Sequence, residues 1–250
     1  MKFPPIDQLV MGLHTIQELL THAPDRLLRV YTVRPQEKRK SALLEECERH
    51  RIPVSFVSND ELSKMAGSDS HQSFVAHVKG RTFYSVLEFV KKVEDEERVL
   101  VLMLDQIFDP QNFGALIRSA ECLGANGVAW SKNRGSDLTP VAAKTSSGAS
   151  EIIPLIRVSN LADAVEKFKE GGFEIVASLL DSSAKSLFEF KYSPRTVLIL
   201  GSEGEGIQPL IRKKADRAIY IPMKGKIQSL NVAQAASVLL AKWAEQAYSG

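Results

Sequence analysis

The hydrophobic positions of this 250-residue sequence alternate between short apolar runs and amphipathic stretches. The clearest run, Val99–Leu104, is apolar throughout, which is typical of a strand buried on both faces of a parallel sheet. Similar runs predict strands at Gly127–Ser131, Phe173–Ser178, Thr196–Gly201 and Ala218–Ile221. Helical spacing predicts the helices between them, at Asn112–Leu123, Leu161–Lys169, Ile207–Lys214 and Ala233–Trp243. This order predicts an α/β fold with helices on both faces of the sheet.

The first 80 residues have a β/α alternation of their own and predict a small separate domain. Helices are expected at Leu13–Leu20 and Glu37–His50, with a short one beginning at Asn59-Asp60-Glu61. Strands are expected at Leu27–Val33, Ile52–Val57 and Ser73–Val78. Residues 81–98 include the acidic run Glu94-Asp95-Glu96-Glu97, which predicts a short solvated helix and a linker. We therefore divide the chain into residues 1–80, a linker at 81–98 and a second domain at 99–250.

Composition and charge narrow the picture only slightly. With 44% hydrophobic and 25% charged residues, the chain resembles an ordinary globular protein, and its net charge of +2 neither implies nor excludes nucleic acid. It has no apolar run of membrane-spanning length and no secretory signal, so we expect a cytoplasmic protein. The two cysteines, Cys47 and Cys122, are expected to be buried reduced thiols. The five histidines show no metal-binding spacing, and no metal is expected.

A first group of candidate residues follows the strand that ends near Leu104. Pro110 predicts a turn, and Asn112 stands where a helix N-cap is expected. The predicted helix buries an apolar face, formed by Leu116, Ile117, Ala120 and Leu123, which leaves Arg118 without a packing role. Ligand sites of open α/β sheets lie at such strand ends. A capping asparagine with a surface arginine is the structural alternative at this point.

A second group is the glycine-rich segment Gly201-Ser202-Glu203-Gly204-Glu205-Gly206, between a predicted strand and a helix. Its spacing is neither the dinucleotide fingerprint nor a Walker loop. Its two glutamates would repel a phosphate, so a neutral or cationic ligand such as the sulfonium of S-adenosylmethionine fits better. A tight strand-to-helix turn without a ligand is the alternative.

A third group begins at Ile221-Pro222-Met223 and ends with Ser229-Leu230-Asn231 before the final helix. Ser229 or Asn231 is suited to cap that helix and to present polar atoms to a ligand. Ile221, Met223 and Leu230 supply apolar side chains for an adenine ring. A capped helix after an ordinary loop remains open for this segment alone.

Together these segments resemble the SpoU/TrmH family of RNA 2′-O-ribose methyltransferases. The matching motifs are DPQNFGALIRSAECLGA, RGSDLTPVAAKTSSGASEIIPL with Lys144 and Gly148-Ala149, LGSEGEGI, and IPMKGKIQSLNVAQAASVLL. They stand in the family's order and cover roughly residues 99–247. The resemblance implies a knotted (trefoil) parallel-sheet methyltransferase domain, an exception to unthreaded topology. It also implies a homodimer whose sites lie near the subunit interface, and the predicted helix Ala233–Trp243 is a candidate for that interface.

The first 80 residues resemble, more loosely, the substrate-binding domain of the subfamily that modifies a guanosine in large-subunit ribosomal RNA. Its fold is similar to ribosomal proteins that bind kink-turn RNA. The matching features are Val10-Met11-Gly12-Leu13-His14 and His71-Gln72, although the family usually has glycine where this chain has Ser73. The resemblance thus implies ribosomal RNA as the partner.

The resemblance assigns roles to ten residues. Asn112, Arg118, Glu203, Ser229 and Asn231 are the expected catalytic group. Family proposals make this arginine a general base, whereas we favour stabilisation of the developing charge on the ribose oxygen by Arg118. The expected contacts of S-adenosylmethionine are Leu200, Gly201, Ile221, Met223 and Leu230. A general-base role for Arg118 is physically demanding because guanidinium groups scarcely deprotonate in proteins.

Three alternatives are kept beside this interpretation. A related enzyme acting on the transfer-RNA D-loop is disfavoured by the separate N-terminal domain. A non-catalytic RNA-binding or assembly protein of the same fold is disfavoured by the presence of Asn112, Arg118, Glu203 and Asn231. A nucleotide-binding dehydrogenase is disfavoured by the glycine spacing.

Overall fold

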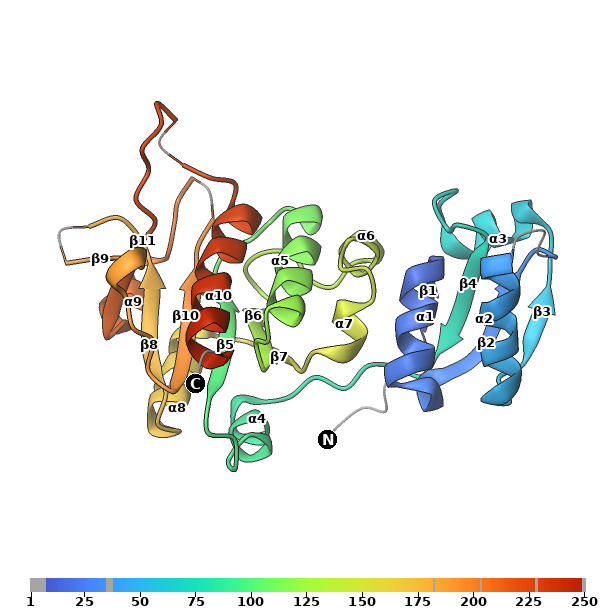
Figure 1. The fold of residues 1–250 in the computed structure, drawn as a ribbon, viewed down its shortest axis with the longest axis horizontal. Coiled ribbons are helices and arrows are strands. Elements are labelled where there is room, and N and C mark those ends of the chain that lie inside the picture. Colours follow the sequence, from blue (N-terminus) through green and yellow to red (C-terminus); the bar gives the residue numbers. More distant parts are fainter. Residues whose placement is uncertain (1–7, 35–37, 182, 203, 228, 249–250) are drawn as a thin grey trace. The chain divides into compact units, whose positions relative to one another are not determined.

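The computed structural model describes residues 8–34, 38–181, 183–202, 204–227 and 229–248 (Figure 1). The chain divides into two compact units. The first comprises Met1–Thr82 and Ala143–Ile152, and the second comprises Phe83–Ala142 and Ile153–Gly250.

The described part of the first unit contains a four-stranded sheet in the order β1-β4-β2-β3. Its strands are β1 (Gln8–Met11), β2 (Leu27–Thr32), β3 (Val54–Phe56) and β4 (Phe74–Val78). The accompanying helices are α1 (Leu13–His22), α2 (Lys38–Arg49) and α3 (Asn59–Ala66). Strand β4 is antiparallel to β1 and β2, whereas β2 and β3 are parallel. All these elements except β1 lie where the hydrophobic pattern predicts them.

A tight turn before β4 is held by a buried histidine. The ring of His71, which is 2% exposed, accepts a hydrogen bond from the Ser73 backbone N–H at 3.1 Å and lies 3.1 Å from the Ser63 hydroxyl. The side chain of Gln72 accepts from the Leu13 N–H at the start of α1, also at 3.1 Å. Gln72 and Ser73 have φ values of 53° and 64°. Ser73 therefore holds a left-handed conformation that glycine adopts more easily.

The segment that joins the first unit from the middle of the chain contributes a buried carboxylate. It contains α7 (Ala149–Ile152), which packs against α1. The Glu151 side chain is fully buried and pairs with Arg26 at 2.8 Å and with Arg81. A buried carboxylate needs such partners, because removing it from water is otherwise costly.

The described part of the second unit forms a seven-stranded parallel sheet in the order β7-β6-β5-β10-β8-β11-β9. The strands are β5 (Val99–Leu104), β6 (Gly127–Ser131), β7 (Leu155–Val158), β8 (Glu174–Ser178), β9 (Lys185–Ser186), β10 (Arg195–Leu200) and β11 (Arg217–Tyr220). Strand β10 lies between β5 and β8, so the segments that follow these three strands meet at one edge. This order confirms the predicted α/β class.

Helices cover both faces of this sheet. On one face, α8 (Leu161–Glu170) contacts α4 (Val86–Lys92) and α9 (Pro209–Lys214). Their core includes Val99, Val101 and Met103 from alternate positions of β5. The other positions of β5 are equally buried, and α5 (Pro110–Cys122) packs beside α10 (Val232–Tyr248), as Figure 1 shows. Helix α6 spans Pro140–Thr145 and crosses the limit between the two units, which falls after Ala142.

The acidic run Glu94–Glu97 is exposed, as predicted. The segment predicted as a linker also contains α4, whose Val86 and Phe89 are buried in the core of the second unit. The domain limits at 80 and 98 stay a prediction.

The prediction of two buried thiols is correct for Cys47 and wrong for Cys122, which is exposed. Helix α5 turns Phe113, Leu116 and Ile117 toward the sheet, and Cys122 lies outside that apolar stripe.

The described residues include no helix long and apolar enough to cross a membrane. Within the same ranges, no group of three histidine, cysteine, aspartate or glutamate side chains is placed to hold a metal ion.

Candidate active site

The carboxyl edge of the larger sheet is fixed by a buried aspartate that follows β5. Asp105 is 0% exposed, and its carboxylate accepts hydrogen bonds from the Gln208 backbone N–H at 2.7 Å and from the Gln208 side-chain amide at 2.6 Å. Asp105 thereby ties the end of β5 to the start of α9. Asp105 was not among the site residues predicted from the sequence, although a charge directly after six apolar residues was a usable signal.

Helix α5, which carries the first motif, begins at Pro110, before its predicted start at Asn112. Asp109 is the N-cap, because its side chain accepts from the Gln111 N–H at 2.8 Å and Pro110 is the first helical residue. The prediction of Asn112 as the cap is therefore wrong. Asn112 lies inside the first turn, where its side chain is available to a partner from another element.

That partner comes from the third motif, 119 residues further along the chain. The Asn231 side-chain amide donates to the Asn112 side-chain oxygen at 3.0 Å, and the Asn231 oxygen accepts from the Ala233 N–H at 2.9 Å. Asn231 thus accepts from the first turn of α10, which the sequence predicted as one of two options. The same amide joins the starts of α5 and α10.

Arg118 lies two turns into α5, on its exposed side. It interacts with Cys122, one turn further on. Partial desolvation and the neighbouring Glu121 raise the pKa of the Cys122 thiol, while the Arg118 guanidinium opposes this shift. The Arg118 side chain thus lies at the surface of the second unit.

The glycine-rich loop folds back on itself between β10 and α9. The Ser202 N–H donates to the Gly206 carbonyl at 3.2 Å, and the Gly206 N–H donates to the Ser202 carbonyl at 3.1 Å. A Cβ atom on Gly201 would lie 2.1 Å from the Gly206 carbonyl carbon. Only glycine fits at position 201, because the two backbone segments approach too closely for a side chain. Glu203 lies outside the described residues.

A cavity of about 470 Å³ opens at the same edge of the sheet, in the size range of small-molecule sites. Four of the ten predicted site residues line it: Ile221, Met223, Ser229 and Leu230. The other lining residues are Ser178, Leu179, Leu180, Tyr220, Pro222, Lys224 and Ala235. Leu179 and Leu180, which follow β8, belong to none of the motifs. Their position at the end of an apolar strand was the only signal for them in the sequence.

The described site residues outside this lining fall into two groups. Leu200 and Gly201 lie at the end of β10, where Leu200 is 3% exposed. Asn112, Arg118 and Asn231 lie at α5 and at the start of α10. The structure therefore brings Asn112 and Asn231 into contact and gathers the apolar residues at one cavity, but it does not place Arg118 in that cavity.

The cavity combines apolar walls, formed by Leu179, Ile221 and Leu230, with polar groups such as the Ser229 hydroxyl. Such a lining suits a ligand with one planar apolar part and one polar part. The fold and site together define an α/β protein with a nucleoside-sized cavity at the carboxyl edge of a parallel sheet.

Comparison with known proteins gives the family. The family model of the SpoU rRNA Methylase family matches residues 99–241, and the model for RNA 2′-O ribose methyltransferase substrate binding matches residues 9–84. The 23S rRNA (guanosine-2′-O-)-methyltransferase RlmB of Acinetobacter baylyi is 34% identical over 231 residues, which cover 92% of this chain and 93% of that protein. The chain therefore belongs to the SpoU family of RNA methyltransferases, and the predicted family is confirmed.

Solved structures agree. The SpoU methyltransferase AviRb from Streptomyces viridochromogenes, in complex with the cofactor AdoMet, has a TM-score of 0.77 at 26% identity and covers 98% of this chain and 92% of its own. The TrmH/SpoU tRNA modifying enzyme of A. aeolicus has a TM-score of 0.56 at 27% identity and covers 66% of this chain and 85% of its own. The similarity to AviRb thus extends over both units.

Proposed function

We propose that this protein transfers the methyl group of S-adenosylmethionine to the ribose 2′-hydroxyl of a guanosine in 23S ribosomal RNA. The observation that carries the proposal is the meeting of the first and third motifs at the sheet edge, where Asn231 bonds Asn112 beside the cavity that contains Ser229 and Leu230. The similarity to RlmB over more than nine-tenths of both chains supports the guanosine substrate. A cytoplasmic location follows from such a substrate.

The residues of the cavity fit the methyl donor. Leu179, Ile221 and Leu230 offer apolar walls for the adenine ring, and Met223 lies at the exposed margin. Gly201 has no side chain, so the backbone after β10 can approach a ligand closely. Leu200, which precedes Gly201, is the last residue of that strand. When bound, S-adenosylmethionine supplies a methyl group that is already activated by the sulfonium.

The protein's own task is to orient a weakly acidic hydroxyl and to stabilise its developing negative charge. In this proposal Arg118 supplies the positive charge and stays protonated throughout. Asn112 and Asn231 fix the ribose or the arginine by hydrogen bonds, and Ser229 completes the polar side. Glu203 has the role of orienting Arg118 or of attracting the sulfonium.

Arg118 is exposed on α5 and does not line the cavity of its own chain. We infer that the active form is a homodimer in which a second copy completes the site, with the adjacent helices α5 and α10 as the candidate interface. The trefoil knot of the methyltransferase domain belongs to the same proposal.

Two other functions are weighed against this one. A transfer-RNA methyltransferase is less well supported, because the A. aeolicus tRNA modifying enzyme covers only 66% of this chain. A non-catalytic RNA-binding protein of the same fold would not need the bond between Asn112 and Asn231 beside a nucleoside-sized cavity.

The test incubates the purified protein with methyl-labelled S-adenosylmethionine and unmodified RNA transcripts. We expect label in the 2′-O-methylguanosine of 23S ribosomal RNA and none in transfer RNA. Label in transfer RNA alone would favour the first alternative. Stoichiometric RNA binding without methyl incorporation would favour the second.

A further inference from the structure

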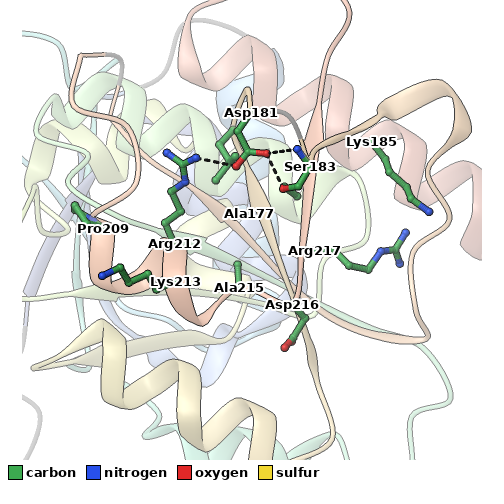
Figure 2. Close-up of a pocket in the computed structure, with 12 residues that line it drawn as sticks. Ala177, Asp181, Ser183, Lys185, Pro209, Arg212, Lys213, Ala215, Asp216 and Arg217 are labelled. Atoms are coloured by element: carbon green, nitrogen blue, oxygen red, sulfur yellow. Dashed lines mark hydrogen bonds and ion pairs between the residues drawn. The ribbon is translucent and has the colours of Figure 1, made fainter.

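A second cavity of about 480 Å³ lies on the second unit, between β8, β11 and α9. Its floor consists of small or apolar residues: Ala177, Leu179, Pro209, Ala215 and Ala218. Its rim is charged and polar, as Figure 2 shows: Asp181, Ser183, Lys185, Arg212, Lys213, Asp216 and Arg217. We call this cavity the basic groove.

The two carboxylates of the groove already have partners. Asp181 accepts from the Ser183 N–H at 2.8 Å and from the Ser183 hydroxyl at 2.7 Å, and it pairs with Arg212 at 2.8 Å (Figure 2). Asp216 pairs with Lys169 at 2.6 Å and accepts from the Ile175 N–H at 2.8 Å. These interactions offset the negative charge within the protein.

The positive charge of the groove is only partly offset. Arg217 pairs with Glu174 at 3.2 Å and lies over the Phe190 ring at 4.0 Å. Lys185 and Lys213 are exposed and make no ion pair among the described residues. The whole chain carries a formal charge of only +2. Two such exposed lysines therefore make the electrostatic potential at this groove more positive than the net charge alone indicates.

The groove also meets the proposed methyl-donor cavity. Leu179 lines both cavities, and its neighbours divide between them: Ser178 and Leu180 line the donor cavity, while Ala177 and Asp181 line the groove. Leu179 therefore lies at the boundary between the groove and the proposed donor cavity.

We propose that the basic groove binds a phosphodiester of single-stranded RNA adjacent to the methylated nucleotide, with Lys185 and Lys213 as its phosphate contacts. This inference rests on the proposed function, because it assigns the path of the same substrate. Positive grooves of this kind follow a nucleic-acid backbone without reading its sequence. The alanine floor leaves room for a flat base beside the phosphate.

The test compares two charge-reversal variants of the full-length protein. K185E/K213E alters the groove, and K91E/K92E makes the same change in charge on exposed positions of α4, elsewhere in the second unit. Each variant is titrated with a single-stranded RNA oligonucleotide over a range of salt concentrations. S-adenosylmethionine affinity is measured in parallel as a check on folding.

For K185E/K213E we expect RNA affinity to fall at least about tenfold at low salt. The slope of log affinity against log salt should become shallower by about 1.4, since each lost phosphate contact on a single strand removes about 0.7. In methylation assays the effect should appear in KM for RNA, and S-adenosylmethionine affinity should not change. K185A/K213A should lose less, in the same direction.

Equal losses in K185E/K213E and K91E/K92E would overturn the groove as an RNA site, as would an unchanged salt slope. The oligonucleotide titration needs no methyl transfer. A protein that binds RNA through the groove but methylates none would therefore contradict the proposed function and leave this inference standing.

Discussion

The donor cavity and the basic groove have nearly the same volume, about 470 and 480 Å³, and both include Leu179. Their linings differ in charge and in the kinds of side chain that form them. The donor cavity has leucine and isoleucine walls with a few polar groups, which suits one small molecule of fixed shape. The groove has an alanine floor and a basic rim, which suits a repeating anion. In these proposals charge, rather than size, distinguishes the cofactor site from the polymer site.

The largest effect is expected where the two ligands react. Arg118→Ala should lower methyl transfer by about 10²–10³-fold, since it removes the charge proposed to stabilise the ribose oxygen. Binding of S-adenosylmethionine should stay close to that of the unaltered protein, because Arg118 does not line the donor cavity. Single-turnover methylation and calorimetric titration of the cofactor measure the two quantities separately.

Full turnover in Arg118→Ala would remove this residue from the mechanism. Loss of cofactor binding with normal chemistry at saturation would reassign it to the pocket.

The next largest effect is expected on S-adenosylmethionine binding alone. Gly201→Ala places a methyl group 2.1 Å from the Gly206 carbonyl carbon, so the loop must move. We expect S-adenosylmethionine affinity to fall at least about tenfold while oligonucleotide binding at the groove persists. Gly204→Ala is the matched control, because nothing lies within 4 Å of its Cβ position. The same cofactor affinity in both variants would contradict a role for the close approach at Gly201.

The sequence predicted the elements of the sheet better than the contacts at its edge. Strands β5 and β6 have the predicted bounds, because runs buried on both faces are apolar from end to end. Strand β7 was not predicted, since it has only four residues, includes Arg157 and follows the short helix α7 almost directly. Local spacing does not separate such short elements.

The candidate site shows the same limit. Motif order grouped Ile221, Met223, Ser229 and Leu230, and these four residues line one cavity. It gave no sign of Leu179 or Tyr220, because these residues reach the cavity through strand order rather than through a motif. The cap of α5 was misplaced because Asp109 and Asn112 are both good capping residues, and only the fold decides between them.

A smaller effect is expected on RNA binding at the basic groove. Hydrogen bonds from Ser183, with help from Arg212, hold the pKa of Asp181 below its usual value, so this carboxylate is ionised at neutral pH. Asp181→Asn removes one negative charge from the rim and releases Arg212. We expect oligonucleotide affinity to rise by about two- to fivefold at low salt, an effect of exposed-pair size. Salt-dependent titration measures it, and a fall in affinity would contradict the electrostatic account.

The smallest effect lies outside both cavities, in the first unit. Ser73→Gly relieves a left-handed backbone that costs roughly 1–2 kcal/mol for an L-residue, partly offset by the greater freedom of unfolded glycine. The backbone bond to His71 is retained. We expect unfolding free energy to rise by about 0.5–1 kcal/mol, measured by denaturant titration. Cofactor and oligonucleotide affinities should not move, and a destabilised variant would show that the serine side chain supports this turn.

The central claim is that the carboxyl edge of the larger sheet delivers a methyl group to one guanosine of 23S ribosomal RNA. The most direct measurement maps 2′-O-methyl positions in ribosomal RNA from cells with the gene, without it, and complemented with the Arg118→Ala variant. The account predicts that one 2′-O-methylguanosine of 23S RNA is lost on deletion and is restored by the unaltered gene but not by the variant. An unchanged methylation map after deletion would contradict it.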